Sequence, residues 1–318
     1  MKRKIIFGIV IFLSLMLFES SASPANFPEK PIKIIVNFPA GAGIDLEARG
    51  ILPYVQKHLG VSASIENVPG ADGKIGITRA WKAKPDGYTL ILHSSTLSSI
   101  LESIHDVEFR TLEFSHIYCI SQSNQVLVVN SEKWKTFDEF VKAARERSLI
   151  AAVSGRGTAA HLSGLILVSE LGIGVNWVPF AGSGEALTAL AGGHVDFAVT
   201  VTTSALSLVK AGKVRPLVVF ANKQDIVFPD VPRAKDLNYE FTMIPLLRGV
   251  DGPPKMEPAI TKVIEGAFEK AVKEPDYVTW AHRRMLDVVS LNQDEYLKAV
   301  QREAKEIEKY KGYFTDKK

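Results

Sequence analysis

Two short glycine-bearing segments carry the residue pattern with the clearest chemistry. The first is Pro39-Ala40-Gly41-Ala42-Gly43-Ile44-Asp45, and the second is Ser154-Gly155-Arg156-Gly157-Thr158. Each follows an apolar strand pattern and precedes a helical pattern, so its peptide N–H groups are expected at the positive end of a helix dipole. Small side chains allow a ligand to approach those amides closely. The pair therefore predicts a site for a carboxylate or phosphate that needs no basic side chain.

A plain tight turn with a helix cap is the competing interpretation, and it is the more common one for either segment taken alone. In an open α/β sheet, ligands lie at the carboxyl ends of the strands, which is where both segments fall. Two similar segments, one in each expected lobe, favour a facing pair.

Other site chemistries receive little support. Residues 155–160 match G-x-G-x-x-A, but the next strand pattern ends at Val178-Pro179-Phe180 without the acidic residue of a dinucleotide site. The seven histidines show no H-x-x-x-H spacing, so no metal site is predicted. Cys119 is the only cysteine, which excludes an intrachain disulfide and predicts a buried structural thiol. No cofactor is expected.

Three charged or titratable residues near these segments keep two interpretations each. His161 lies one turn into the helix after the second segment, where it either contacts the ligand or caps and packs the loop. Asp196 begins a strand and is more typical of a turn anchor than of a catalytic base. Arg156 projects from the second segment, and a solvated side chain is the safer interpretation than a pair with a second carboxylate.

Short apolar strands alternate with helical patterns, which predicts an α/β fold with mostly parallel sheets and flanking helices. The strands Gln125 to Val129 and Val214 to Phe220 are expected to cross between two lobes. The predicted division is residues 26–125 plus 221–318 for lobe 1 and residues 126–220 for lobe 2. The C-terminal helices would then pack on lobe 1.

Two local signals bear on helix ends. Thr136-Phe137-Asp138-Glu139 is a capping box that opens a helix reaching about Arg147. Pro53, inside the helical pattern after the first segment, predicts a kink or an early stop.

The N-terminus has the pattern of a secretory signal peptide over residues 1–25. Basic Lys2-Arg3-Lys4 precedes an apolar run from Ile5 to Phe18, and small residues follow, with cleavage expected after Ala22 or Ala25. An uncleaved membrane anchor is the alternative, although a run of 14 residues is short for a span. The formal charge of +3 falls to about +1 without the leader, which gives no electrostatic case for nucleic acid.

Seven fragments, in order from about Pro31 to near Tyr313, resemble the substrate-binding receptors of tripartite tricarboxylate transporters, also called Bug receptors. Each fragment is weak alone, but seven in the same order make a strong signal. They are the first segment, Glu66-Asn67-Val68-Pro69-Gly70-Ala71-Asp72-Gly73, Pro85-Asp86-Gly87-Tyr88-Thr89-Leu90, the second segment with His161-Leu162, Val178-Pro179-Phe180-Ala181-Gly182-Ser183-Gly184, Gly192-Gly193-His194-Val195-Asp196 and Phe228-Pro229-Asp230-Val231-Pro232.

The resemblance implies a two-lobed periplasmic-binding-protein fold, of the Venus-flytrap type, that closes on a carboxylated solute. In the family, backbone amides and ordered water grip a ligand carboxylate. Carried over by position, the ligand-binding residues are Ala40, Gly41, Ala42, Gly43, Ile44, Asp45, Ser94, Ser95, Thr96, Gly155, Gly157, Thr158, His161, Ser183 and Thr202.

This chain departs from the family pattern at several places, which leaves the identity of the ligand open. Ala42 replaces a usual glycine, and Ile44 is expected to make the edge of the first segment more apolar. Thr200-Val201-Thr202-Thr203 replaces a segment that commonly carries acid and amide groups. Pro245-Leu246-Leu247-Arg248-Gly249 replaces an aromatic-rich stretch.

The preferred hypothesis is a monomeric, periplasmic, non-catalytic receptor that delivers a small carboxylate to membrane transporter subunits. A receptor that reports the ligand to a sensor partner is one alternative. An exported enzyme that uses His161 or Asp196 as a base is another, and it would turn over a small acid.

Overall fold

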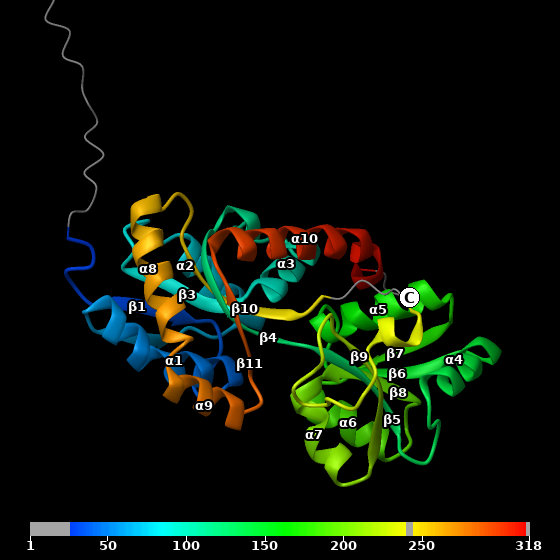
Figure 1. The fold of residues 1–318 in the computed structure, drawn as a ribbon. Helices are drawn as coiled ribbons and strands as arrows, with labels where there is room; N and C mark the ends of the chain where they lie inside the picture. Colours follow the sequence, from blue (N-terminus) through cyan, green and yellow to red (C-terminus); the bar gives the residue numbers. More distant parts are fainter. Residues whose placement is uncertain (1–25, 240–243, 316–318) are drawn as a thin grey trace, which may run out of the picture.

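Two β-sheets with flanking helices form two lobes (Figure 1). The computed structural model describes residues 26–239 and 244–315, so the expected signal peptide lies outside the described residues. The first sheet has the strand order β11-β4-β10-β3-β1-β2, and the second has the order β7-β6-β8-β5-β9. The strands of the first sheet are β1 (Ile32–Val36), β2 (Ala63–Asn67), β3 (Thr89–Ser94), β4 (Ser115–Ser123), β10 (Leu246–Gly252) and β11 (Asp287–Leu291). Those of the second are β5 (Gln125–Asn130), β6 (Leu149–Val153), β7 (Val175–Pro179), β8 (Phe197–Val201) and β9 (Val214–Phe220).

The two-lobed α/β architecture is confirmed, but the prediction of mostly parallel sheets was wrong because both sheets are mixed. In the first sheet, β1 runs parallel to β2 and β3, whereas β10 runs antiparallel to β3 and β4. In the second, β6 is parallel to β7 and β8, whereas β5 is antiparallel to β8 and β9. The chain enters lobe 2 through β5 and returns to lobe 1 through β10, so both strands start at the hinge and run away from it. They are therefore antiparallel to the strands beside them.

Helices cover both faces of each sheet. On lobe 1, α1 (Gly43–Leu59), α8 (Pro258–Ala271) and α9 (Pro275–Arg283) pack on one face, and the other face carries α2 (Lys74–Trp81), α3 (Ser95–Ile104) and α10 (Gln293–Thr315). On lobe 2, α4 (Phe137–Glu146) and α5 (Ala159–Leu171) pack opposite α6 (Ser183–Ala191) and α7 (Thr202–Lys210). Short 3₁₀ helices lie at Ala71–Gly73, Thr111–Glu113 and Ala234–Leu237.

Helix α10 packs on both lobes. The sequence predicted only its packing on lobe 1. Its Tyr296 and Val300 pack with Cys119 and Leu247 of lobe 1, while Ile307 and Tyr310 join the core of lobe 2. Ile100 of α3 joins the same core of lobe 2. Figure 1 shows α3 and α10 beside α5, on the side of the hinge away from α6, α7 and α9. The two lobes are therefore tied on one side of the hinge.

This tie explains why the first nine residues of α5 are buried on all sides. Every residue from 159 to 167 is buried, because α5 packs on its own sheet and also faces α3 and α10. Cys119 is buried, as predicted. Thr136 caps α4 as predicted, since its Oγ1 accepts the N–H of Glu139 at 3.2 Å. The predicted early stop at Pro53 was wrong, because α1 continues to Leu59.

A buried carboxyl group joins α10 to the start of α3. The hydroxyls of Ser95 and Thr96 donate to Glu303 at 2.9 and 2.8 Å, and Glu303 is only 4% exposed. Burial raises the pKa of Glu303 to about 8, despite these hydrogen bonds. The group is thus largely protonated at neutral pH, and ionising it in this buried site destabilises the folded state.

Asp196 anchors the edge of lobe 2, in agreement with its interpretation as a turn anchor. Its carboxylate accepts hydrogen bonds from Lys133 Nζ at 2.7 Å, from Arg147 at 2.9 and 3.0 Å, and from the N–H of Ile150 at 2.9 Å. Burial alone would raise the pKa of Asp196, but the hydrogen bonds outweigh it and hold the pKa well below its usual range.

The substitution Glu303→Gln should remove an alkaline instability. A carboxyl whose pKa is higher in the folded than in the unfolded state loses stability as pH rises towards the folded value. We expect the free energy of unfolding of the unsubstituted protein to fall by on the order of 3 kcal/mol between pH 6 and 9, and that of E303Q to change much less. Denaturant titrations across this pH range test it, and equal slopes for the two proteins would contradict it.

The substitution Asp196→Asn should act at the opposite end of the pH scale. A lowered folded pKa gives stability that is present above about pH 4 and is lost as pH falls. We expect D196N to lose about 1–2 kcal/mol at pH 7, because Lys133 and Arg147 are partly solvated, and to show a flatter acid limb below pH 4. The exposed Asp230→Asn is the matched control, and an effect of the same size there would refute the assignment.

Candidate functional site

The strand directions bring the predicted loops to one region. The strand β4 leaves lobe 1 at Ser123, and β5 enters lobe 2 at Gln125. Since β1 and β3 run in the direction of β4, and β6 and β8 run against β5, their carboxyl ends all point to the hinge. Counting outward from hinge strands β10 and β5, β1 and β6 are each the second strand. The first and second segments therefore occupy equivalent places on the two hinge-facing edges.

The first segment is braced by the carboxylate of Asp45. This group accepts the N–H of Gly41 at 2.8 Å, Nε of Arg49 at 3.0 Å and Nδ2 of Asn67 at 2.8 Å. Burial acts to raise the pKa of Asp45, but these hydrogen bonds outweigh it and lower the pKa. Asp45 is only 1% exposed, so its side chain fixes the shape of the loop from within.

The brace leaves a group of open amides at the start of α1. Ala42, the residue before the helix, provides no side-chain cap, and the N–H groups of Gly43, Ile44 and Asp45 have no acceptor within residues 26–239 and 244–315. Ala40, Gly41 and Gly43 are exposed. Unpaired N–H groups at a helix N-terminus attract an anion through hydrogen bonds and the helix dipole.

Ile44 differs from its expected role. Its side chain is 7% exposed and packs in the core under α1, so it does not make the edge of the loop apolar. Its position in the first turn of the helix turns the side chain inwards while the peptide N–H faces the helix end.

The second segment is capped by its own side chains. Thr158 Oγ1 accepts the N–H of His161 at 3.2 Å, and His161 Nδ1 accepts the N–H of Gly157 at 3.2 Å. Burial, followed by the charge of Arg156, lowers the pKa of His161 to about 4, so the ring is neutral and carries its proton on Nε2. The ring also packs edge-on against Trp177 with centroids 5.1 Å apart. The geometry thus gives His161 the capping and packing role, while a ligand contact stays a prediction.

Gly157 has a structural reason to be glycine. Its φ is +71°, and a Cβ there would lie 2.8 Å from Cδ1 of Ile104 and 3.5 Å from Cγ2 of Ile100, both on α3. The close approach of α3 and the left-handed backbone both exclude a larger residue. At Gly155 there is room for a Cβ, but its φ of +110° is a backbone conformation that residues with a side chain rarely adopt.

The hydroxyl residues after β3 are occupied within the protein. Ser94 Oγ caps α3 by accepting the N–H of Leu97 at 3.3 Å, and Ser95 and Thr96 donate to Glu303. All three are at most 5% exposed. Their predicted place lining the mouth of the cleft stays untested, and their observed bonds serve α3 and α10.

On lobe 2, the start of α6 has unpaired amides. Of the residues that carry them, only Ser183 was predicted from the sequence to bind the ligand. Gly182 gives no side-chain cap, and Ser183, Gly184 and Glu185 have no backbone acceptor among the described residues. Their signal was the Gly-Ser-Gly triplet at the end of a strand. Thr202 is instead 2% exposed and donates its N–H to the hinge carbonyl of Asn124 at 3.0 Å.

A hydrogen-bonded serine, histidine and aspartate occur in the core of lobe 1, where no spacing in the sequence predicts them. Ser98 Oγ lies 2.7 Å from His93 Nδ1, and His93 Nε2 lies 2.5 Å from Asp251 Oδ2. His116 Nδ1 contacts the other oxygen of Asp251 at 2.9 Å. Ser98, His93 and Asp251 have no exposed surface, so the group is part of the core and no substrate reaches it.

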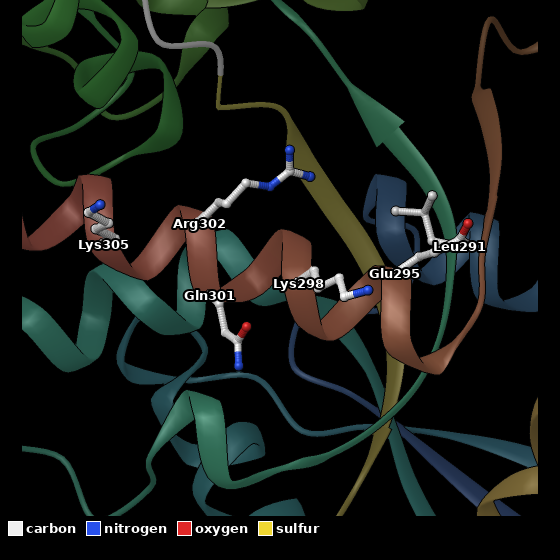
Figure 2. A pocket seen from close by; sticks show the side chains of 6 residues that line it. All are labelled: Leu291, Glu295, Lys298, Gln301, Arg302 and Lys305. Atoms are coloured by element: carbon white, nitrogen blue, oxygen red, sulfur yellow. The ribbon is translucent and has the colours of Figure 1, made fainter.

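Three cavities lie away from both segments. The one in Figure 2 has a volume of about 680 Å³ and is lined by Leu291 and by charged or polar side chains of α10, namely Glu295, Lys298, Gln301, Arg302 and Lys305. A second, of about 740 Å³, lies beside the hinge between α10, β11 and the end of β9, and a third lies on α4. None of the three is lined by a predicted ligand residue.

The described part of the chain contains neither a cluster of metal-ligating side chains nor a membrane-spanning helix. No group of three or more His, Cys, Asp or Glu side chains there is arranged to hold a metal ion. None of the described helices combines the length and apolarity that crossing a membrane requires.

Comparisons with known proteins bear on the whole arrangement. Residues 48–311 match the family described as tripartite tricarboxylate transporter family receptor. The protein BugT of Bordetella pertussis is 29% identical over 272 residues, which cover 83% of each chain.

Two solved structures share the fold and more than a quarter of the aligned residues. A TctC solute-binding protein from Polaromonas, solved without ligand, superposes with a TM-score of 0.81 at 26% identity, covering 90% of this chain and 98% of that one. MatC from Rhodopseudomonas palustris, solved with bound malate, gives a TM-score of 0.72 at 26% identity, covering 90% of this chain and 100% of that one. The resemblance drawn from the seven fragments is confirmed, and the chain belongs to the tripartite tricarboxylate transporter receptor family.

Proposed function

We propose that this protein captures a small carboxylate between its two lobes and delivers it to the membrane subunits of a tripartite tricarboxylate-type transporter. The observation that carries the proposal is the open first turn of α1, at a hinge-facing edge, where three N–H donors have no acceptor among the described residues. The malate bound to MatC supports a carboxylate as the ligand class. No step of capture requires covalent chemistry.

Binding and closure are coupled in this proposal. One carboxylate oxygen accepts from the amides of α1, and the ligand reaches across to lobe 2, where the start of α6 offers open donors. Contacts made only when the lobes approach shift the equilibrium from an open to a closed form. The moving units proposed are residues 26–125 with 221–318 and residues 126–220, joined by the strands that cross the hinge.

Export to the periplasm and a monomeric state belong to the same proposal. The basic and apolar pattern of residues 1–25 supports export, and BugD, which shares the fold with a TM-score of 0.71, is described as a periplasmic binding protein. A ligand site completed by two lobes of one chain needs no second copy.

A thermal-shift screen against small organic acids should identify the ligand class. An acid present at about 100 times its Kd adds roughly 2.7 kcal/mol to the free energy of unfolding, which raises the melting temperature by several degrees. Amines and neutral sugars of similar size serve as controls. A screen in which no acid stabilises the protein, while a neutral or cationic solute does, would contradict the proposal.

The substitution Gly43→Val should weaken binding without harming the fold. A Cβ at Gly43 meets nothing within 4 Å, so the added methyl groups project into the space in front of the open amides. We expect at least about a tenfold rise in Kd by calorimetry. Gly157→Val is a poorer test, because a Cβ there lies 2.8 Å from Ile104 and alters α3 as well.

Gly266→Val is the matched control for G43V, since a Cβ at Gly266 of α8 also meets nothing within 4 Å. Both variants should keep the circular dichroism spectrum of the unsubstituted protein. Equal ligand affinity in G43V and G266V would rule out the amides of α1 as the carboxylate site.

A further inference from the structure

Arg248 places a guanidinium at the hinge-facing edge of lobe 1. It lies on β10 opposite Ser94, the last residue of β3, so it shares the carboxyl-end edge with the predicted loops. Its Nη1 donates to Ser123 Oγ, at the end of β4, at 3.1 Å. The side chain is 15% exposed, and its Nε and Nη2 have no acceptor in the described part of the chain. The guanidinium is thus fixed through Nη1, while Nε and Nη2 can donate to a ligand.

The neighbouring acid does not fully satisfy this cation. Glu47 Oε2 lies 3.4 Å from Arg248 Nη1, but neither carboxylate oxygen of Glu47 makes a hydrogen bond among the described residues. Burial raises the pKa of Glu47, and the charge of Arg248 offsets only part of that rise. Tyr277 of α9 is within reach of the charges of both groups, and its buried hydroxyl makes no hydrogen bond among the described residues. The pair with Glu47 engages only Nη1 of Arg248, so Nε and Nη2 stay available to a partner from outside.

The cation lies close to the open amides. Glu47 follows Ile44 by three residues on α1, so the two are separated by about one turn, or roughly 5 Å along the helix. Nη1 of Arg248 lies 3.4 Å from the side-chain Oε2 of Glu47, at the inner end of that turn. A small molecule with two anionic groups several ångströms apart can therefore reach both the amides and the guanidinium. A guanidinium with free Nε and Nη2 presents the fork that binds a carboxylate through two hydrogen bonds.

We propose that Arg248 is a ligand-contacting cation that selects solutes carrying a second anionic group in addition to the carboxylate held by α1. The inference rests on the proposed function and gives it a specificity determinant. It also assigns a role to residues 245–249, where this chain departs from the aromatic-rich stretch that the family resemblance leads one to expect. The amides of α1 alone bind a monocarboxylate and a dicarboxylate alike. A guanidinium at a fixed distance from them favours the dicarboxylate.

Calorimetry with paired probes tests this role. The probes are straight-chain dicarboxylates from succinate to suberate, malate, and the monocarboxylates with matching numbers of carbons. The proteins are the unsubstituted chain, Arg248→Gln, Arg248→Lys and the control Arg79→Gln, which removes a half-exposed cation of α2. We expect at least one diacid to bind the unsubstituted protein more tightly than its monoacid partner. R248Q should lose about 10- to 100-fold in diacid affinity with little change for monoacids, and R248K should lose less.

The double variant Glu47→Gln/Arg248→Gln separates a ligand contact from simple charge balance. It removes both groups, so neither is buried without its partner and the fold is protected if R248Q alone is unstable. If Arg248 only neutralises Glu47, the double variant regains the diacid affinity of the unsubstituted protein, which overturns the inference. If Arg248 contacts the ligand, the double variant stays as weak as R248Q.

The remaining outcomes are also decisive. Equal preference for diacids in R248Q and the unsubstituted protein, or a preference of the unsubstituted protein for monoacids, overturns the role of Arg248 while the carboxylate receptor stands. Failure of the unsubstituted protein to bind any mono- or dicarboxylate removes the proposed function and the inference with it.

Discussion

The uncapped first turn of α1 is the feature on which the rest of the site depends. Two of the helices that begin near the hinge satisfy an early N–H group with a side chain, as Ser94 does for α3 and Thr158 for α5. The helix α1 instead leaves three donors open, and the buried carboxylate of Asp45 holds the loop around them in shape. An open helix N-terminus is costly unless water or an anion pairs with it. The loop is thus preorganised for an anion, which lowers the ordering cost of binding.

The two glycine segments are similar in sequence but differ in how their peptide N–H groups are paired. The first exposes its amides, while the second uses Thr158 and His161 to pair its own and meets α3 at Gly157. This asymmetry follows from the tie between the lobes. On the side where α3 and α10 pack against α5, the second segment is part of a fixed contact. The closure that we propose therefore acts on the other side of the hinge, where α1 and α6 present open helix ends.

Much of this arrangement was predictable because its signals are local. Strand and helix patterns, the Thr136 cap and the small residues of the first segment each reflect neighbours within a few positions. The rest depends on partners far away in sequence. Ser95 and Thr96 were predicted as ligand contacts, yet their hydroxyls bind Glu303 more than 200 residues later. The burial of His93 against Asp251 arises only when β3 and β10 pair within lobe 1, and the approach of Ile104 to Gly157 only when the two lobes pack together. A glycine in the sequence indicates that space is needed, and a serine that a hydroxyl is available. Neither indicates which distant residue is the partner.

The most direct measurement of the central claim is the response of individual backbone amides to a bound acid, by ¹⁵N–¹H correlation NMR of the protein saturated with malate or whichever organic acid binds. New hydrogen bonds from peptide N–H groups to a carboxylate move their proton resonances downfield. We expect large downfield shifts for Gly43 and Ile44, and small ones for Gly41 and Gly157, whose N–H groups already pair with Asp45 and His161. Saturation by a ligand that leaves the resonances of Gly43, Ile44 and Asp45 unmoved would contradict it.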